Sequence, residues 1–207
     1  MPPAEADTDV LLERAGDGDQ VAVDALLVRH RPRLRAMVKL RLDCRVAARI
    51  DPSDVVQEAL LEAYRRLPEF LRERPIPFYP WLRQLAWDKL VRLHQRHIHS
   101  QKRSVDREAT IDPVLTDDSV AALASKLWKS STGPHSRIVK AELRDRLQTA
   151  LGQLSETDRE LLILRYIEQL SIQEIMAVLS LRESAVNLRL LRALQRMRKH
   201  FGSSEGT

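Results

Sequence analysis

The C-terminal part of the chain has the clearest pattern of apolar and polar positions. From Leu154 to Lys199 it reads LSETDRELLILRYIEQLSIQEIMAVLSLRESAVNLRLLRALQRMRK, with three successive helical patterns and little loop between them. The first pattern starts after Ser155. The second starts at Ser171 and has Glu174 three residues on, which is the capping-box spacing. The third starts near Glu183, so the sequence predicts a helix-turn-helix.

The second and third patterns also predict which faces are buried. One face of the second helix collects its apolar residues, Ile172, Ile175, Met176 and Leu179. The third helix should bury Val186 and Leu190 and leave Arg182, Asn187, Arg189 and Arg192 in solvent. Geometry alone leaves two interpretations open, a DNA-binding motif and an ordinary helix pair. The basic third helix favours DNA binding.

Two helices are predicted at the start of the chain. Val10–Ala15 forms a short helix that breaks at Gly16-Asp17-Gly18, and Asp19 can cap a long pattern from Gln20 to about Leu42. Pro32 lies within this pattern and predicts a kink or a junction there, because proline removes a helical hydrogen bond.

A further helix is predicted at Asp54–Leu67. Asp51-Pro52-Ser53 is its start signal, and Pro68 should end it. Its inward side consists of Val55, Val56, Leu60 and Tyr64. Its exposed side carries the polar residues Asp54, Gln57, Glu58 and Glu62.

Aromatic and basic residues are interleaved in the next stretch. A proline-stiffened loop, Leu71–Pro77, leads into a helix at Phe78–His97, and six of the nine aromatic residues lie between Tyr64 and Trp87. The helix also carries Arg83, Lys89, Arg92 and Arg96. Rings that stack on bases beside cations that hold phosphates suit single-stranded nucleic acid. The alternative is that Trp81, Leu82, Leu85 and Trp87 simply form the core.

The histidines and the single cysteine do not predict a metal centre. His94 and His97 could share a helical face, but Cys44 is the only cysteine, and neighbouring arginines would repel a cation. We expect a solvated, basic helix end at these histidines, with no metal and no cofactor.

Loop signals are densest at residues 100–137, which include Asp112-Pro113 and Ser130-Ser131-Thr132-Gly133-Pro134. Such a segment is too long to be structureless within one compact domain. We therefore predict an all-α protein with two small helical domains, residues 10–99 and 138–200, joined by a flexible linker at 100–137.

Charge and composition narrow the class of protein. The formal net charge of +5 fits a partner that is a polyanion, although many proteins with other roles have the same charge. Arg29–Arg49 carries eight Lys or Arg residues against one acid, Asp43, while Glu108–Ser125 carries four acids and no base, which indicates separate faces or separate domains. The start MPPAEADTD is acidic and lacks an apolar run, so we do not expect it to be a secretory leader. We expect no membrane span either, because no apolar run is long enough. The lone Cys44 fits a reducing compartment. These features predict a cytoplasmic protein.

The two halves together resemble one family, the bacterial sigma-70 factors, and in particular the short extracytoplasmic-function (ECF) group that keeps only regions 2 and 4. DPSDVVQEALLEAYRRL at Asp51–Leu67 looks like regions 2.1–2.2, and PFYPWLRQLAWDKL at Pro77–Leu90 looks like regions 2.3–2.4. ALGQLSETDRELLILRYIEQLSIQEIMAVLSL at Ala150–Leu181 is similar to region 4. The resemblance covers roughly residues 10–98 and 138–200.

The resemblance implies a non-catalytic subunit that binds core RNA polymerase, directs it to promoter DNA and helps to open the duplex. Region 2.2 in this family docks on the largest polymerase subunit, which would assign that partner to Asp54, Gln57, Glu58 and Glu62. The resemblance also implies an anti-sigma factor as a partner that binds between the two domains.

Regions 2.3–2.4 of the family hold the single-stranded −10 element and capture a flipped base. The resemblance implies that the loop Leu71–Pro77 and the helix start at Phe78, Tyr79 and Trp81 shape the pocket for that base. Lys89, Arg92 and Arg96 would line the DNA backbone, and Trp87 and Asp88 belong to the same −10 site. Family members often have Asn near the position of Asp88. An acid there either changes the base preference or pairs with Arg92, four residues on.

Region 4 of the family reads the double-stranded −35 element in the major groove. This would place Arg182, Ser184, Asn187, Leu188, Arg189, Leu191 and Arg192 at the DNA. Asn187 could read adenine, and a leucine could contact a thymine methyl group. Met176 and Ser180 depart from the small residue and the glycine that are usual at these positions.

Two other classes of protein stay open on the residues alone. A helix-turn-helix regulator that never binds polymerase would leave the polar motif at Asp54–Glu58 and the aromatic helix at Phe78–Trp87 unexplained. A metal-dependent nuclease could use Asp51, Asp54 and Glu58, but the chain has no motif that combines a nucleophile, a base and a phosphate loop. We therefore expect that the protein is not an enzyme.

Overall fold

The computed structural model describes residues 3–42, 50–99 and 137–202, with side chains at 3–6, 96–99, 137–144 and 200–202 left out of the description. Within this part the chain is helical with short turns and has no strand, which confirms the all-α prediction. The chain divides into two compact units, Met1–Val114 and Leu115–Thr207. The predicted linker at 100–137 lies outside the described residues, except for its last residue.

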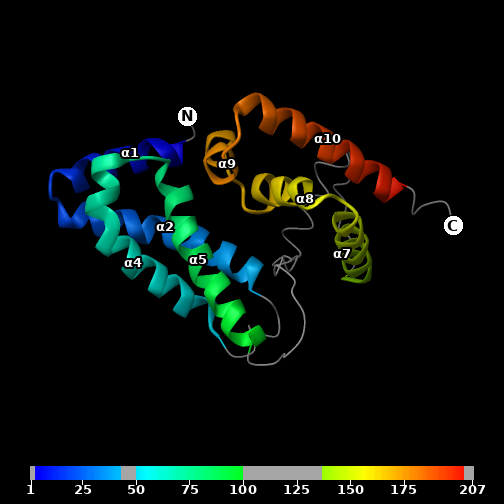
Figure 1. Ribbon diagram of the computed structural model, residues 1–207, viewed down its shortest axis with the longest axis horizontal. Helices are drawn as coiled ribbons and strands as arrows, with labels where there is room; N and C mark the ends of the chain where they lie inside the picture. The colour runs from blue at the N-terminus through cyan, green and yellow to red at the C-terminus, as the bar shows by residue number, and fades with distance from the viewer. Residues whose placement is uncertain (1–2, 43–49, 100–136, 203–207) are drawn as a thin grey trace. The chain divides into compact units, whose positions relative to one another are not determined.

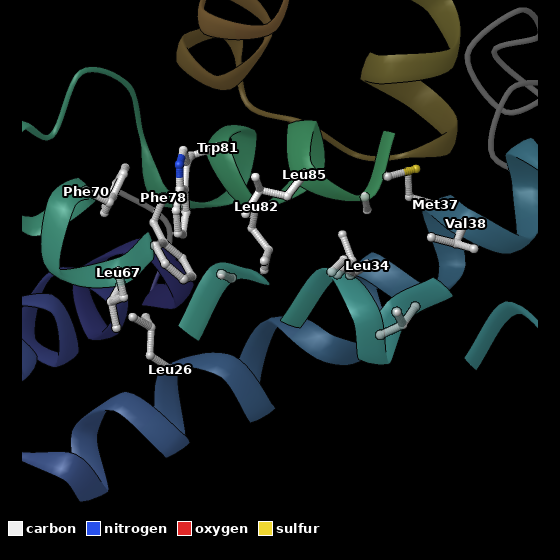
Figure 2. Close-up of a cluster of buried hydrophobic side chains, with 14 of the residues drawn as sticks. Leu26, Leu34, Met37, Val38, Leu67, Phe70, Phe78, Trp81, Leu82 and Leu85 are labelled. Atoms are coloured by element: carbon white, nitrogen blue, oxygen red, sulfur yellow. The ribbon is translucent and has the colours of Figure 1, made fainter. Parts of the chain in front are cut away.

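The described residues of the first unit form four helices around one core (Figure 1). They are α1 (Pro3–Gly16), α2 (Gln20–Arg41), α4 (Pro52–Glu73) and α5 (Phe78–His99). Figure 2 shows its centre, where the rings of Phe70, Phe78 and Trp81 meet. Phe70 and Trp81 stack with their ring centroids 4.5 Å apart. This aromatic contact fixes the end of α4 against the start of α5.

Two expectations for the first helices need correction. The first helix begins at Pro3, well before the predicted Val10. Its early residues are held to α2, because Asp7 pairs with Arg29 at 3.0 Å and Thr8 lies 3.2 Å from the His30 ring. α2 continues through Pro32 to Arg41, which excludes a junction there, while the alternative, a kink, stays a prediction.

The predicted end of α4 is wrong, since the helix runs past Pro68 to Glu73. Pro68 is exposed, while Leu67 and Phe70 beside it are 2% and 3% exposed. Burial of these two side chains outweighs the one hydrogen bond that Pro68 removes. Tyr64 was expected inside but is 47% exposed, because Ala59 and Ala63 occupy the buried face.

The histidine prediction is wrong for His94, which is only 3% exposed. Its ring nitrogen Nδ1 lies 2.9 Å from the carbonyl oxygen of Leu90, one turn earlier in α5. His97 lies outside the described side chains. Within the described residues no group of three His, Cys, Asp or Glu side chains could hold a metal ion.

The caps of the first unit predict how its stability depends on pH. Asp19 caps α2, and the Arg14 guanidinium that hydrogen-bonds to it lowers the pKa of its carboxyl group. The backbone N–H of Ser53 likewise lowers the pKa of Asp51, the cap of α4. A lowered folded-state pKa adds stability above the unfolded value, and this is lost as the pH falls through the folded value.

We therefore expect the free energy of unfolding of this unit to decline below about pH 4. Asp19→Asn should flatten that decline, whereas Asp24→Asn, at an exposed position within α2, should not. Urea unfolding followed between pH 2.5 and 6 measures both profiles. If the unfolding free energies of wild type and Asp19→Asn fall equally with decreasing pH, the Asp19 cap does not cause the decline.

The second unit contains the predicted helix-turn-helix. Its helices are α7 (Arg137–Gly152), α8 (Glu156–Leu162), α9 (Ile172–Leu179) and α10 (Glu183–Gly202), with a π-helical segment η1 (Ile163–Ile167) after α8. Ser155 caps α8 by accepting the backbone N–H of Asp158 at 3.3 Å. The capping box of Ser171 and Glu174 is complete, which confirms the prediction for α9.

The turn between α9 and α10 holds a strained residue. Ser180 has φ = 53°, in the left-handed region where glycine is favoured. We expect Ser180→Gly to stabilise this unit by about 0.5–1 kcal/mol, because relief of left-handed strain exceeds the entropy that glycine adds to the unfolded chain. Chemical denaturation measures the change. Ser180→Ala is the matched control and should bring no gain.

Candidate nucleic-acid interface

Helix α10 has an inner face that is buried in the second unit and an outer face that carries both polar and apolar side chains. Val186, Ala193 and Met197 are fully buried, and Leu190 is 6% exposed. On the outer side Leu188 is 47% and Leu191 55% exposed. The other predicted −35 residues are exposed as well: Arg182, Ser184, Asn187, Arg189 and Arg192. The predicted reading residues therefore all reach solvent from one rigid helix and the turn before it.

The polar side of α4 is the predicted polymerase face. Asp54, Gln57 and Glu58 are exposed and Glu62 is half-buried. The Glu58 carboxylate lies 3.7 Å from the Nζ atom of Lys89 on α5, so the face continues onto the neighbouring helix. Leu61, at 57% exposure, and Tyr64 adjoin it as apolar neighbours. The sequence analysis did not single out Leu61. It placed Tyr64 on the inward side of the helix, so it did not assign Tyr64 to this face either.

The predicted −10 residues divide into buried and exposed groups. Phe78, Tyr79 and Trp81 are only 3%, 3% and 7% exposed, so they offer no free ring face for a base in this structure. The start of α5 turns these rings toward α2 and α4. That they shape a pocket for the flipped base stays a prediction. The alternative that Trp81, Leu82 and Leu85 belong to the core is confirmed.

The remaining predicted −10 residues follow α5 toward its C-terminal end. Trp87 is half-buried, with the Arg41 and Arg83 guanidiniums 5.4 and 5.6 Å from its ring centroid. Asp88 and Arg92 are exposed, and no ion pair joins these two described side chains. Lys89 is half-buried beside Glu58, and Arg96 lies outside the described side chains.

A cavity of about 310 Å³ opens where α4 ends and α5 begins, and we call it the loop hollow. It is lined by Arg66, Glu69, Phe70, Glu73, Pro75, Ile76, Trp81 and Gln84. Its apolar lining includes Phe70 and Trp81, and its exposed polar residues include two carboxylates and an amide. This size lies at the lower end of the range for small-molecule pockets.

A second cavity, of about 270 Å³, lies between α8 and α10, and we call it the arginine hollow. It is lined by Ser155, Thr157, Asp158, Arg189, Arg192 and Arg196. Sequence reasoning missed Arg196, which pairs with Asp158 across the unit. Thirty-eight residues separate these two, so no local pattern could have joined them.

Comparison with known proteins identifies both units. The family model described as Sigma-70 region 2 matches residues 26–104, and the one described as Sigma-70, region 4 matches residues 144–197. The chain belongs to the ECF group of the sigma-70 family. It is an RNA polymerase sigma factor, and this family consists of transcription initiation factors.

Curated relatives agree with this assignment over most of the sigma factor. It is 29% identical to the ECF RNA polymerase sigma-E factor of Escherichia coli K12, over 89% of this chain and 88% of that protein. It is 27% identical to the ECF RNA polymerase sigma factor SigD of Mycobacterium bovis, over 92% and 82% of the two chains.

A solved structure supports the fold of this sigma factor. The structure of CnrH in complex with the cytosolic domain of CnrY matches with a TM-score of 0.53 and 23% identity, over 95% of this chain and 98% of that one. None of the described helices is long and apolar enough to cross a membrane.

Proposed function

We propose that this sigma factor grips a promoter with two separate domains, residues 10–99 at the −10 element and residues 138–200 at the −35 element. The loop hollow is the observation that carries this proposal. It is an aromatic-lined, polar-edged cavity in a different unit from the helix-turn-helix. A regulator that only binds duplex DNA has no need of such a cavity. A protein that captures an unstacked base does, since unstacking costs a few kcal/mol that the pocket must recover.

Core polymerase docks on the polar face of α4 in this proposal. Asp54, Gln57 and Glu58 are exposed there, and Glu62 is half-buried at the edge. The exposed Leu61 and Tyr64 add apolar area beside these acids. An apolar centre with a charged rim is the usual composition of a protein–protein interface.

The −10 grip combines the loop hollow with the basic side of α5. Trp81 lines the hollow, and Phe78 supports it from the core by packing against Phe70 and Trp81. Tyr79 packs on the other side, against His30 and Arg33 of α2. Glu69 and Glu73 can accept hydrogen bonds from exocyclic amino groups of the captured base. Trp87, Lys89, Arg92 and Arg96 follow the strand, while the exposed Asp88 sets the base preference apart from that of relatives with Asn.

The −35 grip uses the outer face of α10. Asn187 is placed to read adenine, and Leu188 and Leu191 to contact thymine methyl groups. Arg182 and Ser184 lie at the start of the helix, where recognition helices usually meet base edges, and Arg189 and Arg192 lie further along it.

A protein inhibitor is the last partner that we propose for this sigma factor. CnrH was solved in complex with the cytosolic domain of another protein, CnrY. By analogy we propose that an anti-sigma factor holds the present sigma factor inactive in the cytoplasm, and that no cofactor, metal or catalytic step is involved.

Mapping transcription start sites after overexpression tests this proposal. Two shared elements should appear upstream of the induced starts, one near −35 and one near −10. Induced starts that share only a single duplex element would favour the regulator that does not bind polymerase.

A further inference from the structure

Three arginines of α10 form a strip on a different side of the helix from Asn187, Leu188 and Leu191, the residues proposed to read the bases. Arg189, Arg192 and Arg196 are spaced by three and four residues, so they lie on one side of the helix over about 10 Å. The helical rotation of 100° per residue places this strip between the buried side at Val186 and Ala193 and the reading side. The strip therefore faces the edge of whatever groove α10 enters.

The arginine hollow brings two hydroxyl groups to these arginines. Ser155 and Thr157, at the start of α8, line it together with the three guanidiniums, and both residues are exposed. Guanidinium forks and hydroxyl donors are the groups that hold phosphate oxygens in protein–DNA complexes. The one acid in the hollow, Asp158, is already committed to Arg196.

Asp158 gives Arg196 a fixed orientation. Asp158 is only 6% exposed, whereas the side chain of Arg196 remains 54% exposed. The carboxylate accepts from Nη1 of Arg196 and leaves the other guanidinium donors available. A side chain that is already ordered loses less entropy when it binds a ligand.

We propose that the arginine hollow binds one phosphate of the DNA backbone at the edge of the −35 groove, with Asp158 as a positioning residue for Arg196. This inference rests on the proposed −35 role of α10 and adds a sequence-independent anchor to it. Such an anchor fixes the register of the recognition helix, while Asn187, Leu188 and Leu191 supply the sequence preference. An acidic segment of a protein partner is the competing occupant.

The test uses the full chain and two duplexes of equal length, one selected from a random pool by the wild-type protein and one unrelated. Affinity is measured against salt concentration for each. Arg192→Gln should weaken binding of both duplexes by the same factor, severalfold at low salt. Arg192→Gln with Arg196→Gln should reduce the steepness of log K against log salt by about 0.9, the value for one neutralised phosphate.

Controls separate this anchor from other effects. Arg31→Gln, on α2, makes the same change in net charge and should leave the affinity and the salt dependence near wild type. Asn187→Ala should weaken only the selected duplex and keep the slope. Circular dichroism shows whether the double variant folds. If it does not, the single variant Arg192→Gln still tests the phosphate site, because it leaves the pair of Arg196 with Asp158 intact.

Unchanged affinity and slope in Arg192→Gln would overturn the phosphate proposal and favour the acidic partner segment. Loss confined to the selected duplex would overturn it too, because it would make Arg192 a base reader. A wild-type chain that selects no duplex would instead contradict the −35 role. The slope on the unrelated duplex would still decide the phosphate site.

Discussion

Replacement of Glu58 by lysine is expected to weaken binding of core polymerase by about 10- to 100-fold, equivalent to roughly 1.4–2.8 kcal/mol. Glu58 is exposed near the middle of the polar face of α4, and its side chain keeps 66% of its area in solvent. The change reverses one charge of the proposed interface and sets a like charge beside Lys89. The dissociation constant for core enzyme, from fluorescence anisotropy of labelled sigma factor, is the measurement.

Two comparisons make the Glu58→Lys result specific. Glu13→Lys on α1 introduces the same charge reversal at another exposed position and should leave polymerase affinity near wild type. The Glu58→Lys protein should still bind a −35 duplex through α10. Polymerase affinity that is unaffected by Glu58→Lys would remove this face from the proposed interface.

Truncation of Leu82 to alanine should cost the first unit about 2–5 kcal/mol of unfolding free energy. Leu82 is completely buried on α5, within the core that joins α2, α4 and α5 (Figure 2). A loss of that size is a large part of the total stability of a small domain, about 5–15 kcal/mol. Denaturant unfolding followed by the tryptophans at 81 and 87 reports this unit.

The matched control for Leu82 is another leucine of the same unit. Leu61→Ala removes the same atoms from a side chain that is 57% exposed, and its effect should stay within about 0.5 kcal/mol. Similar losses in the two variants would show that the core does not depend on Leu82. A large loss for Leu61 alone would mean that its surface is covered in the free protein.

Local signals explain what the sequence predicted well. The capping residues Asp19, Ser155 and Ser171 each bond to a backbone N–H two or three residues away, and all three caps are present. The burial of Val186 and Leu190 likewise follows from the period of a single helix. Such features depend on a few neighbouring residues, which a sequence displays directly.

Tertiary packing explains the errors. Pro68 lies inside α4 because Leu67 and Phe70 are buried against other helices, a gain that no local rule contains. Tyr64 was expected inside together with Val55, Val56 and Leu60, although Ala59 and Ala63 lie on the buried face and Tyr64 does not. The pair of Asp158 and Arg196 joins α8 to α10, so the arginine hollow became visible only in three dimensions.

The aromatic residues before and within α5 show how far a functional site can be predicted from the sequence. Interleaved rings and bases suited single-stranded nucleic acid, with a core role as the alternative, and Phe78, Tyr79 and Trp81 are buried. What the sequence could not display is the loop hollow, whose lining comes from α4, the turn at Pro75 and Ile76, and α5. The core interpretation of Trp81 is therefore confirmed, and the −10 role of this segment stays a prediction.

Complex formation with core RNA polymerase is the most direct test of the central claim. The purified full chain is mixed with core enzyme from its own host and passed through a size-exclusion column. The two should elute together, and the complex should start transcription at promoters that core enzyme alone ignores. A chain that folds and binds DNA but never elutes with core enzyme would contradict the proposed polymerase docking and promoter grip.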